Sequence, residues 1–460
     1  MVSILGANSV SGGYEVSNSL RFNDGDTAKL ARTPSGASNR KTWTWSGWVK
    51  RSTLGAIQGL FVVDTGSAES ALGFLANDTL RFYQTGQTNG LVTNAVFRDL
   101  SAWYHIVLIS DTTQSTESSR TKLYINGEQV TSFSAAEYLS QNADTEFNTT
   151  NPHEIGFYSN QTGGAGHFDG YMAEVNFIDG TAKAHTDFGE TNDNNVWVPI
   201  KYTGTYGTNG FFLQFKQTGT SANSSGIGAD TSGNDNHFAV TNLAATDVTT
   251  DTCTNNFATI FPFSADSGNI SEGNLKYTST TDSGTSTISV SSGKWYVEMC
   301  VNSNNNSYLG VIDVSANGIN PNRGGDWTST GAIAYKANGE QYSLPVGGSA
   351  STASYGSSYT SGDIIGIALD ITSDTITFYK NNVSQGNTTN GPSDIQSNGS
   401  YSFFIYGTNS TITFNAGQDS SFAGAKTAQN NADGNGYGDF YYSPPSGYYA
   451  LNTKNLAEFG

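Results

Sequence analysis

A strand–turn–strand phrase occurs twice in this sequence, and it restricts the fold more than any other feature. The two stretches are TKLYINGEQV (residues 121–130) and TITFYKNNVSQG (residues 375–386). In each, alternating apolar side chains lead into a turn, and the pairs Asn126-Gly127 and Asn381-Asn382 accept the positive φ angles of a type I′ hairpin. Each phrase follows an apolar strand that ends in Asp, HIVLISD and IIGIALD. This matching order predicts two antiparallel units of similar design.

The rest of the chain has the same strand-and-turn character. No stretch shows the sustained apolar period of an amphipathic helix. Tyr and Phe number 24 and 25 and favour strands, whereas 53 glycines favour turns. A chain of 460 residues also exceeds what one ordinary core supports. We therefore predict an all-β protein with more than one domain.

The spacing of the strands predicts how the chain is organised. The expected segments are an N-terminal extension (1–14), a first strand-rich unit (15–195), an irregular connector with some strands (196–270), a second unit (271–422) and a loop-like tail (423–460). The first residues lack the basic region and long apolar core of a signal peptide. No run is long enough to cross a bilayer. We therefore expect a soluble protein made in a cytoplasm.

The two strand-rich units resemble two known families. The first resembles laminin-G-like, concanavalin-A-type lectin domains through SLRFNDGDTAKLAR, WSGWVKR, WYHIVLISD, KLYINGEQV, HEIGFYS and FDGYMAEVNFIDG. The second resembles SPRY domains through GKWYVEM, YLGV, GDIIGIALD, TITFYKNNVSQG and ITFNAG. Both resemblances imply two antiparallel jelly-roll β-sandwiches, joined here by the β-rich connector. The hairpin phrase would then recur because related sandwiches share it.

The order of domains carries a further resemblance. A laminin-G-like unit, a linker with DTSGNDNHF, a SPRY-like unit and a tail with PPSGYYALNTKNL are similar to structural proteins of marine bacteriophages, especially those that infect cyanobacteria. The resemblance implies a virion surface protein that is assembled in the host cytoplasm.

Charge and sequence motifs exclude several classes of function. The chain has 21 Lys and Arg against 39 Asp and Glu, a formal net charge of −18, which argues against nucleic-acid binding. Retaining glycosidases need two carboxyl groups about 5 Å apart. On this fold the acids commonly follow the pattern E-x-D-x-x-E along one strand. Glu154 has Gly156 in place of the Asp and Ser159 in place of the second Glu, and Glu174 has no acid two or five residues later. We therefore predict that the protein is not an enzyme.

The binding residues that we predict lie in the loops of the SPRY-like unit, where that family typically recognises ligands. The candidates are Asn305, Arg323, Asp326 and Trp327. Trp327 has an alternative role as a cap on the core. In the first unit, the alternation of WTWSGWVKR favours core positions for Trp43 and Trp45, and we expect the same of Trp103.

Calcium is the one cofactor that the sequence indicates, because the resemblance implies rim loops with hard oxygen ligands. The candidate ligands are Asp64, Asp230, Asn234 and Asp235. Ordinary Asx turns are the alternative, and we favour it. Cys253 and Cys300 have no C-x-x-C motif, so we expect buried thiols rather than a metal site, and a disulfide stays open.

These observations favour a non-enzymatic tail-fibre or tail-appendage adhesin that binds host cell-surface glycan. Its expected partners are other virion proteins, further copies of itself and host polysaccharide or lipopolysaccharide, with neither nucleic acid nor membrane insertion. One alternative is a capsid decoration or head fibre without receptor binding. A glycan-degrading enzyme and a secreted eukaryotic lectin are weaker alternatives, because paired acids and a signal peptide are missing.

Overall fold

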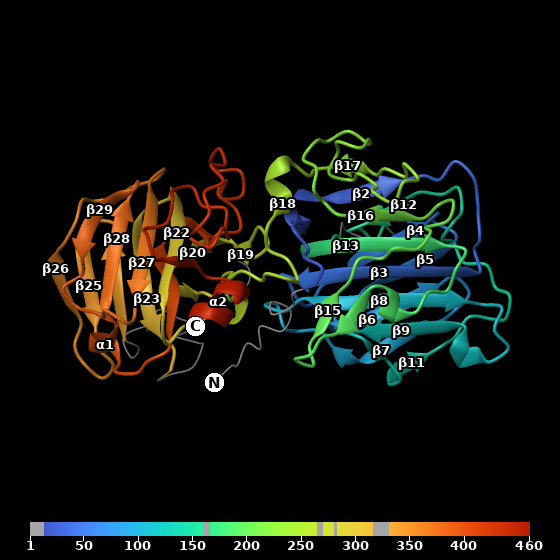
Figure 1. The fold of residues 1–460 in the computed structure, drawn as a ribbon, viewed down its shortest axis with the longest axis horizontal. Helices are drawn as coiled ribbons and strands as arrows, with labels where there is room; N and C mark the ends of the chain where they lie inside the picture. Colours follow the sequence, from blue (N-terminus) through green and yellow to red (C-terminus); the bar gives the residue numbers. More distant parts are fainter. Residues whose placement is uncertain (1–12, 160–165, 265–269, 280–282, 316–330) are drawn as a thin grey trace. The chain divides into compact units, whose positions relative to one another are not determined.

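The computed structural model describes residues 13–159, 166–264, 270–279, 283–315 and 331–460. The chain divides into two compact units, the first ending at Thr254 and the second comprising Asn255–Gly460. Figure 1 shows that arrows dominate both units and that helices are few and short. The prediction of an all-β protein made of antiparallel sandwiches is confirmed.

The first unit is a sandwich of two sheets. The β3 sheet has the order β10 (Glu128–Gln129), β9 (Thr121–Ile125), β8 (Tyr104–Asp111), β3 (Thr42–Arg51), β13 (Gly170–Asp179), β1 (Ser19–Phe22) and β18 (Val248–Thr249), and β16 (Phe211–Leu213) also pairs with β13. The β5 sheet has the order β11 (Phe133–Ala136), β7 (Leu91–Val96), β6 (Thr79–Gln84), β5 (Glu69–Phe74), β4 (Gln58–Asp64), β12 (His153–Ile155), β2 (Lys29–Arg32) and β17 (Ala239–Thr241).

Short elements complete the first unit. Strands β14 (Gly189–Thr191) and β15 (Trp197–Pro199) form a separate pair. Single 3-10 turns are η1 (Asp24–Asp26), η2 (Glu117–Ser119), η4 (His185–Asp187) and η5 (Ala245–Asp247).

The second unit is also a sandwich. The β22 sheet has the order β19 (Ile270–Ser271), β20 (Lys276–Ser279), β31 (Ser410–Asn415), β22 (Lys294–Ser303), β27 (Ile364–Asp370), β28 (Thr375–Lys380) and β29 (Val383–Asn387), with β32 (Tyr449–Ala450) parallel to β22. The β23 sheet has the order β21 (Ser283–Thr285), β30 (Tyr401–Thr408), β23 (Asn306–Asp313), β24 (Ala332–Lys336), β25 (Glu340–Leu344) and β26 (Ser351–Ser354). The helical elements are η6 (Pro262–Ser264), α1 (Pro392–Ile395) and α2 (Thr453–Phe459).

The core of the first unit follows from the alternation along β3. Trp43 and Trp45 point into the sandwich and are fully buried, so their expected core positions are confirmed. Trp103 is 6 % exposed and belongs to a separate buried cluster with Trp48 and Tyr171. The Trp43 ring meets the edge of Phe147 at 4.9 Å between ring centroids, a favourable aromatic geometry.

The repeated hairpins have the same geometry in both units. Asn126 and Asn381 both have a φ of 48°. The Asn126 amide donates to the carbonyl of His105 at 2.9 Å, and the Asn126 Oδ1 accepts from the amide of His105 at 2.7 Å. Asn381 makes the same two bonds with Ile364, at 2.9 Å and 2.8 Å. Each Asn therefore closes its hairpin and ties it to the preceding strand.

The predicted connector does not stand apart from the two units. Its strands β16, β17 and β18 extend the sheets of the first unit by pairing with β13, β2 and β1. The chain from Asn255 onward belongs to the second unit. Backbone pairing explains this division, because a short strand satisfies its amides and carbonyls only against a neighbouring strand.

The tail differs from the loop-like segment that we predicted. It contains β32, which pairs with β22, and the helix α2. The Asn452 side chain caps this helix by accepting from the amide of Asn455 at 2.9 Å. No helix in the described part of the chain is long and apolar enough to cross a membrane.

Candidate functional site

The outer face of the β5 sheet carries a polar and aromatic group of residues over a small apolar floor. Strand register places Glu154, Val62, Ala71 and Tyr83 side by side on this face. Their neighbours along each strand point into the core, as the pleat requires. Val62 and Ala71 have small side chains, and the Tyr158 ring fills the space above them, so all three side chains are buried.

Two tyrosines and an arginine enclose this floor. Tyr158, which follows β12, packs on Val62 and Ala71. The Arg81 Nη2 donates to the Tyr158 hydroxyl at 2.8 Å. The Arg81 guanidinium carbon lies 5.1 Å from the ring centroid of Tyr83 and 5.8 Å from that of Tyr158, within cation–π range. Arg81 and Tyr83 are only half-buried, so a ligand can reach both.

Two carboxylates lie next to the rings. Asp64 and Glu69 stand directly opposite each other at the ends of β4 and β5. The Tyr158 hydroxyl donates to Glu69 Oε1, and the Ser159 hydroxyl donates to Asp64 Oδ2 at 3.0 Å. Burial, together with the bond to Glu69, raises the pKa of Tyr158 well above its ordinary value, so its hydroxyl remains a donor at physiological pH. We call Asp64, Glu69, Arg81, Tyr83 and Tyr158 the Arg81 cluster.

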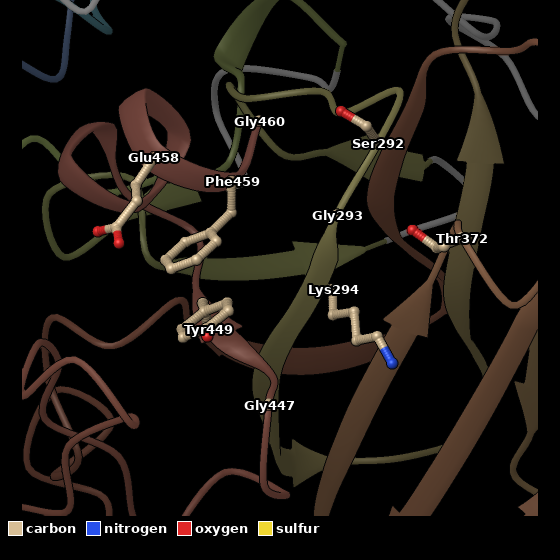
Figure 2. Close-up of a pocket in the computed structure, with 9 residues that line it drawn as sticks. All are labelled: Ser292, Gly293, Lys294, Thr372, Gly447, Tyr449, Glu458, Phe459 and Gly460. Atoms are coloured by element: carbon tan, nitrogen blue, oxygen red, sulfur yellow. The ribbon is translucent and has the colours of Figure 1, made fainter.

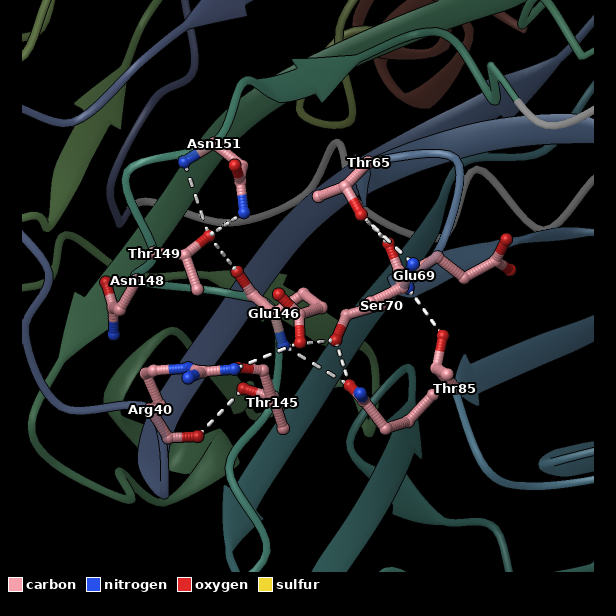
Figure 3. A network of polar contacts seen from close by, with 12 residues as sticks. Arg40, Thr65, Glu69, Ser70, Thr85, Thr145, Glu146, Asn148, Thr149 and Asn151 are labelled. Carbon is pink, nitrogen blue, oxygen red and sulfur yellow. Dashed lines mark hydrogen bonds and ion pairs between the residues drawn. The ribbon is translucent and has the colours of Figure 1, made fainter.

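A second polar network holds the strands beneath the Arg81 cluster in place. Figure 3 shows the Glu69 side chain turned away from this network, whereas Ser70 points into it, as alternation requires. The Ser70 hydroxyl accepts from the amide of Glu146 at 2.8 Å, and the Glu146 carboxylate pairs with Arg40 at 3.0 Å. The Glu69 amide donates to the Thr85 hydroxyl at 2.6 Å. The loop after β11 is thereby tied to β5 and β6, which gives the cluster a rigid support.

Comparison with known families identifies both units. Residues 23–186 match the concanavalin A-like lectin/glucanases superfamily, and residues 294–419 match the SPRY domain. The chain carries a concanavalin A-like domain and a SPRY domain. The two family resemblances stated from the sequence are thus confirmed, whereas the phage origin stays a prediction.

Solved structures resemble parts of the chain at low identity. The SPRY domain of human HERC1 is 22 % identical and covers 30 % of this chain and 87 % of its own, with a TM-score of 0.24. A putative carbohydrate binding protein from Bacteroides ovatus is 14 % identical and covers 49 % and 58 %, with a TM-score of 0.32. A SAP-like pentraxin from Limulus polyphemus is 14 % identical and covers 38 % and 82 %, with a TM-score of 0.28. The comparison with curated proteins gives no match.

Of the residues predicted to bind ligand in the SPRY domain, only Asn305 can be placed. It is exposed in the turn between β22 and β23, and its amide donates to the Ser410 hydroxyl at 3.1 Å. Arg323, Asp326 and Trp327 lie outside the described residues. The proposal that these four residues form a site therefore stays a prediction.

The candidate calcium ligands occupy two places in the concanavalin A-like domain. Asp64 belongs to the Arg81 cluster, and the other three lie in one loop before β17. The Asp230 carboxylate accepts from the amides of Phe212, Ser232 and Asn236 at 2.8 to 2.9 Å and from the Ser232 hydroxyl at 2.8 Å.

The remaining two candidates differ in what they contact. Asn234 donates to the carbonyls of Gly207 and Gly210, whereas the Asp235 side chain is 89 % exposed and lies 3.6 Å from His237. The bond from the Ser232 amide to Asp230 is that of an Asx turn, the alternative that we favoured, whereas calcium binding stays a prediction. Within the described residues, no group of three or more His, Cys, Asp and Glu is placed to hold a metal ion.

The two acids considered for catalysis have partners of other kinds. Glu154 forms an ion pair with Lys29 at 2.6 Å. Glu174 sits in a bulge of β13 with a φ of 51° and accepts from the Tyr14 hydroxyl at 2.8 Å. Burial raises the pKa of Glu174 to about 7. Neither contact is the pair of carboxyl groups that a retaining glycosidase uses.

A hollow of about 470 Å³ lies in the SPRY domain (Figure 2). Tyr449 and Phe459, which line it, stack on each other with ring centroids 3.9 Å apart. Lys294 points its amine toward Asp370, at 2.8 Å. Tyr449 and Phe459 are the only aromatic residues among those that line the hollow, and each covers a face of the other, so we assign no ligand to it.

The Arg81 cluster was missed by reasoning from the sequence. The stretch TLRFYQ alternates, so it does predict that Arg81 and Tyr83 share one face of a strand. It does not indicate that Tyr158 and the two acids reach the same place, because three other segments bring them there.

Proposed function

We propose that the protein is a non-enzymatic, glycan-binding adhesin of a virion surface, and that the Arg81 cluster is its sugar-binding site. The observation that carries the proposal is a half-buried Arg81 between the rings of Tyr83 and Tyr158, above an apolar floor on the outer face of a concanavalin A-like domain. The family description of residues 23–186 includes lectins, which supports binding of carbohydrate.

The chemistry of the cluster suits a sugar. A pyranose ring has an apolar face that packs on an aromatic ring, and its hydroxyls take hydrogen bonds from planar polar groups. Tyr83 supplies the ring, and the guanidinium of Arg81 supplies donors in a fixed fork geometry. The half-buried Asp64 supplies an acceptor beside them, whereas the buried Glu69 holds the Tyr158 hydroxyl in place. A few placed polar groups beside an aromatic ring are typical of small-molecule sites.

The absence of catalysis is part of the proposal. A retaining glycosidase would use two carboxyl groups, one as acid and one as nucleophile. Glu69 and Asp64 instead accept hydrogen bonds from Tyr158 and Ser159, and Glu154 forms an ion pair with Lys29.

The virion role rests on the resemblance of the domain order to phage structural proteins. In this role the protein is assembled in the host cytoplasm and displayed on the particle, where it contacts other virion proteins, further copies of itself and host polysaccharide or lipopolysaccharide. Several weak sites on one particle would bind cells firmly through avidity. A net charge of −18 disfavours nucleic acid as a partner.

The test is binding of the purified protein to host-type cells and to their extracted lipopolysaccharide. Arg81→Ala and Tyr83→Ala should each weaken binding about tenfold or more, which corresponds to ~1.4 kcal/mol. Arg81→Lys should also weaken it, because Lys keeps the charge but loses the fork. Lys122→Ala, which removes the same charge from β9 in the opposite sheet, is the matched control and should bind normally.

The outcomes of this test distinguish the adhesin from the capsid decoration and from the enzyme. Saturable binding that competes with phage adsorption supports the adhesin. Binding that survives both substitutions moves the site away from the Arg81 cluster. A folded protein that binds neither cells nor polysaccharide fits a capsid decoration, and release of reducing ends from the polysaccharide would make it an enzyme.

A further inference from the structure

A lysine and an aspartate meet in the interior of the concanavalin A-like domain. Lys50 is on β3, and Asp251 is the second residue after β18. The Lys50 Nζ lies 2.8 Å from Asp251 Oδ2, and the two side chains are 1 % and 0 % exposed. The residues are 201 positions apart in the sequence. The contact therefore joins a central strand to the segment that closes the domain.

Aromatic groups surround this pair. The Lys50 Nζ lies 5.5 Å from the ring centroid of Tyr171. The indole nitrogen of Trp103 donates to Asp251 Oδ1 at 3.4 Å, so each carboxylate oxygen has a different partner. Trp103 and Tyr171 belong to one buried cluster that also contains Trp48 and Val16. Water is thus kept from both the Lys50 amine and the Asp251 carboxyl group.

A buried ion pair of this kind is costly to keep as ions. Removing both charges from water is costly, and their mutual attraction repays that cost only where further hydrogen bonds support both ions. The interior therefore holds an amine and a carboxyl group in contact, 2.8 Å apart and out of reach of water. These are the two groups from which an amide forms.

We propose that Lys50 and Asp251 join in an intramolecular isopeptide bond. The amine nitrogen of Lys50 attacks Cγ of Asp251, which forms the C–N bond. The Cγ–Oδ2 bond breaks, and Oδ2 leaves as water with two of the three ammonium protons. One of them passes to Oδ2 before the attack and the other leaves the nitrogen after it, so the third remains as the amide N–H. Oδ1 becomes the amide oxygen, and the Trp103 N–H stabilises the negative charge that develops on it during the reaction. The step needs no oxidant, and the net charge is unchanged because one charge of each sign disappears.

The SPRY domain supplies an internal comparison. Lys294 and Asp370 lie at the same N–O distance, 2.8 Å, but the Lys294 side chain is 41 % exposed. Water solvates this ammonium, so the charged pair is stable and the amine remains protonated. Burial, not distance, therefore distinguishes the pair that we expect to react.

The test is the mass of the intact, folded protein, followed by peptide mapping. We expect the full chain to be lighter than its sequence by one water molecule. Trypsin should fail to cleave after Lys50 and should release one branched peptide that contains Lys50 and Asp251. The peptides with Lys294 and Asp370 should be unlinked.

Variants test whether a missing water molecule comes from the bond between Lys50 and Asp251. Lys50→Met should restore the full mass, and the double variant Lys50→Met/Asp251→Leu does so without leaving a buried carboxylate unpaired. The wild type should unfold at a higher denaturant concentration than the double variant, because a link across the domain restricts the unfolded chain. A wild-type mass equal to the sequence would overturn the proposal, as would a water loss that maps to any other residue.

Discussion

Glu298 of the SPRY domain is a fully buried carboxyl that holds the tail. Its Oε2 accepts from the amide of Tyr441 and its Oε1 from the amide of Tyr442, both at 2.8 Å. The Tyr296 hydroxyl donates to Oε1 at 3.3 Å. Burial raises the pKa of Glu298 from 4.5 to about 7, because the loss of water around the charge outweighs these hydrogen bonds.

This pKa predicts how the stability of the SPRY domain depends on pH. The folded-state pKa lies above the unfolded one, so the stabilisation is fully present below pH 4.5 and is lost as the pH rises through about 7. One pKa unit corresponds to ~1.4 kcal/mol, so the whole effect is about 3 kcal/mol. Glu298→Gln removes the titrating proton and should remove this pH dependence.

The assay is hydrogen–deuterium exchange of the β22 peptide, with wild type and Glu298→Gln compared at each pH so that intrinsic exchange rates cancel. Between pH 4.5 and 7.5 the protection of the wild type relative to the variant should fall about a hundredfold, the equivalent of about 3 kcal/mol. Glu340→Gln, at a solvated carboxyl of the same domain, is the control and should show no such fall. A ratio that stays constant with pH would refute the argument, since Glu298 would then be ionised throughout and its two amide bonds would outweigh burial.

Three further predictions concern the sandwiches. Trp43→Ala should lower the free energy of unfolding of the concanavalin A-like domain by about 3–5 kcal/mol in calorimetry, and a loss below about 1 kcal/mol would contradict its place in the core. Asn381→Ala should cost the SPRY domain about 1–3 kcal/mol in urea unfolding, because Ala loses the bond to Ile364 and disfavours positive φ. Asn381→Gly, which relieves only the backbone strain, should cost less. A calcium chelator should leave the thermal midpoint unchanged, because chain donors already surround the Asp230 carboxylate; a clear fall in the midpoint would establish a bound ion.

The hairpins illustrate what local sequence can predict. Asn126 and Asn381 adopt positive φ in the turn and bond to His105 and Ile364 on the strand just before each hairpin. The residues that matter therefore lie only 21 and 17 positions apart in the sequence. The burial of Trp43 and Trp45 follows from alternation along one strand in the same way. Such features need no knowledge of the rest of the chain.

The helix α2 and the strands of the connector illustrate the limit of this reasoning. Asn452 is a usable N-cap, but a helix of seven residues is marginal without packing, and its sequence shows no long apolar period. The strands β16 and β18 are too short to be stable alone and exist because β13 and β1 offer open edges. Partners from elsewhere in the chain decide their structure.

The sequence by itself determined that this protein is all-β, that it carries two related sandwiches, and that each contains the same hairpin, because strand periodicity and turn chemistry act over a few residues. Only the tertiary structure decided that Arg81 meets Tyr158, and that Lys50 meets Asp251 across 201 positions. Sheet register and burial place these groups together, and both arise from pairing and packing between distant segments. The chemistry of a site therefore appears only after the strands that carry it are aligned.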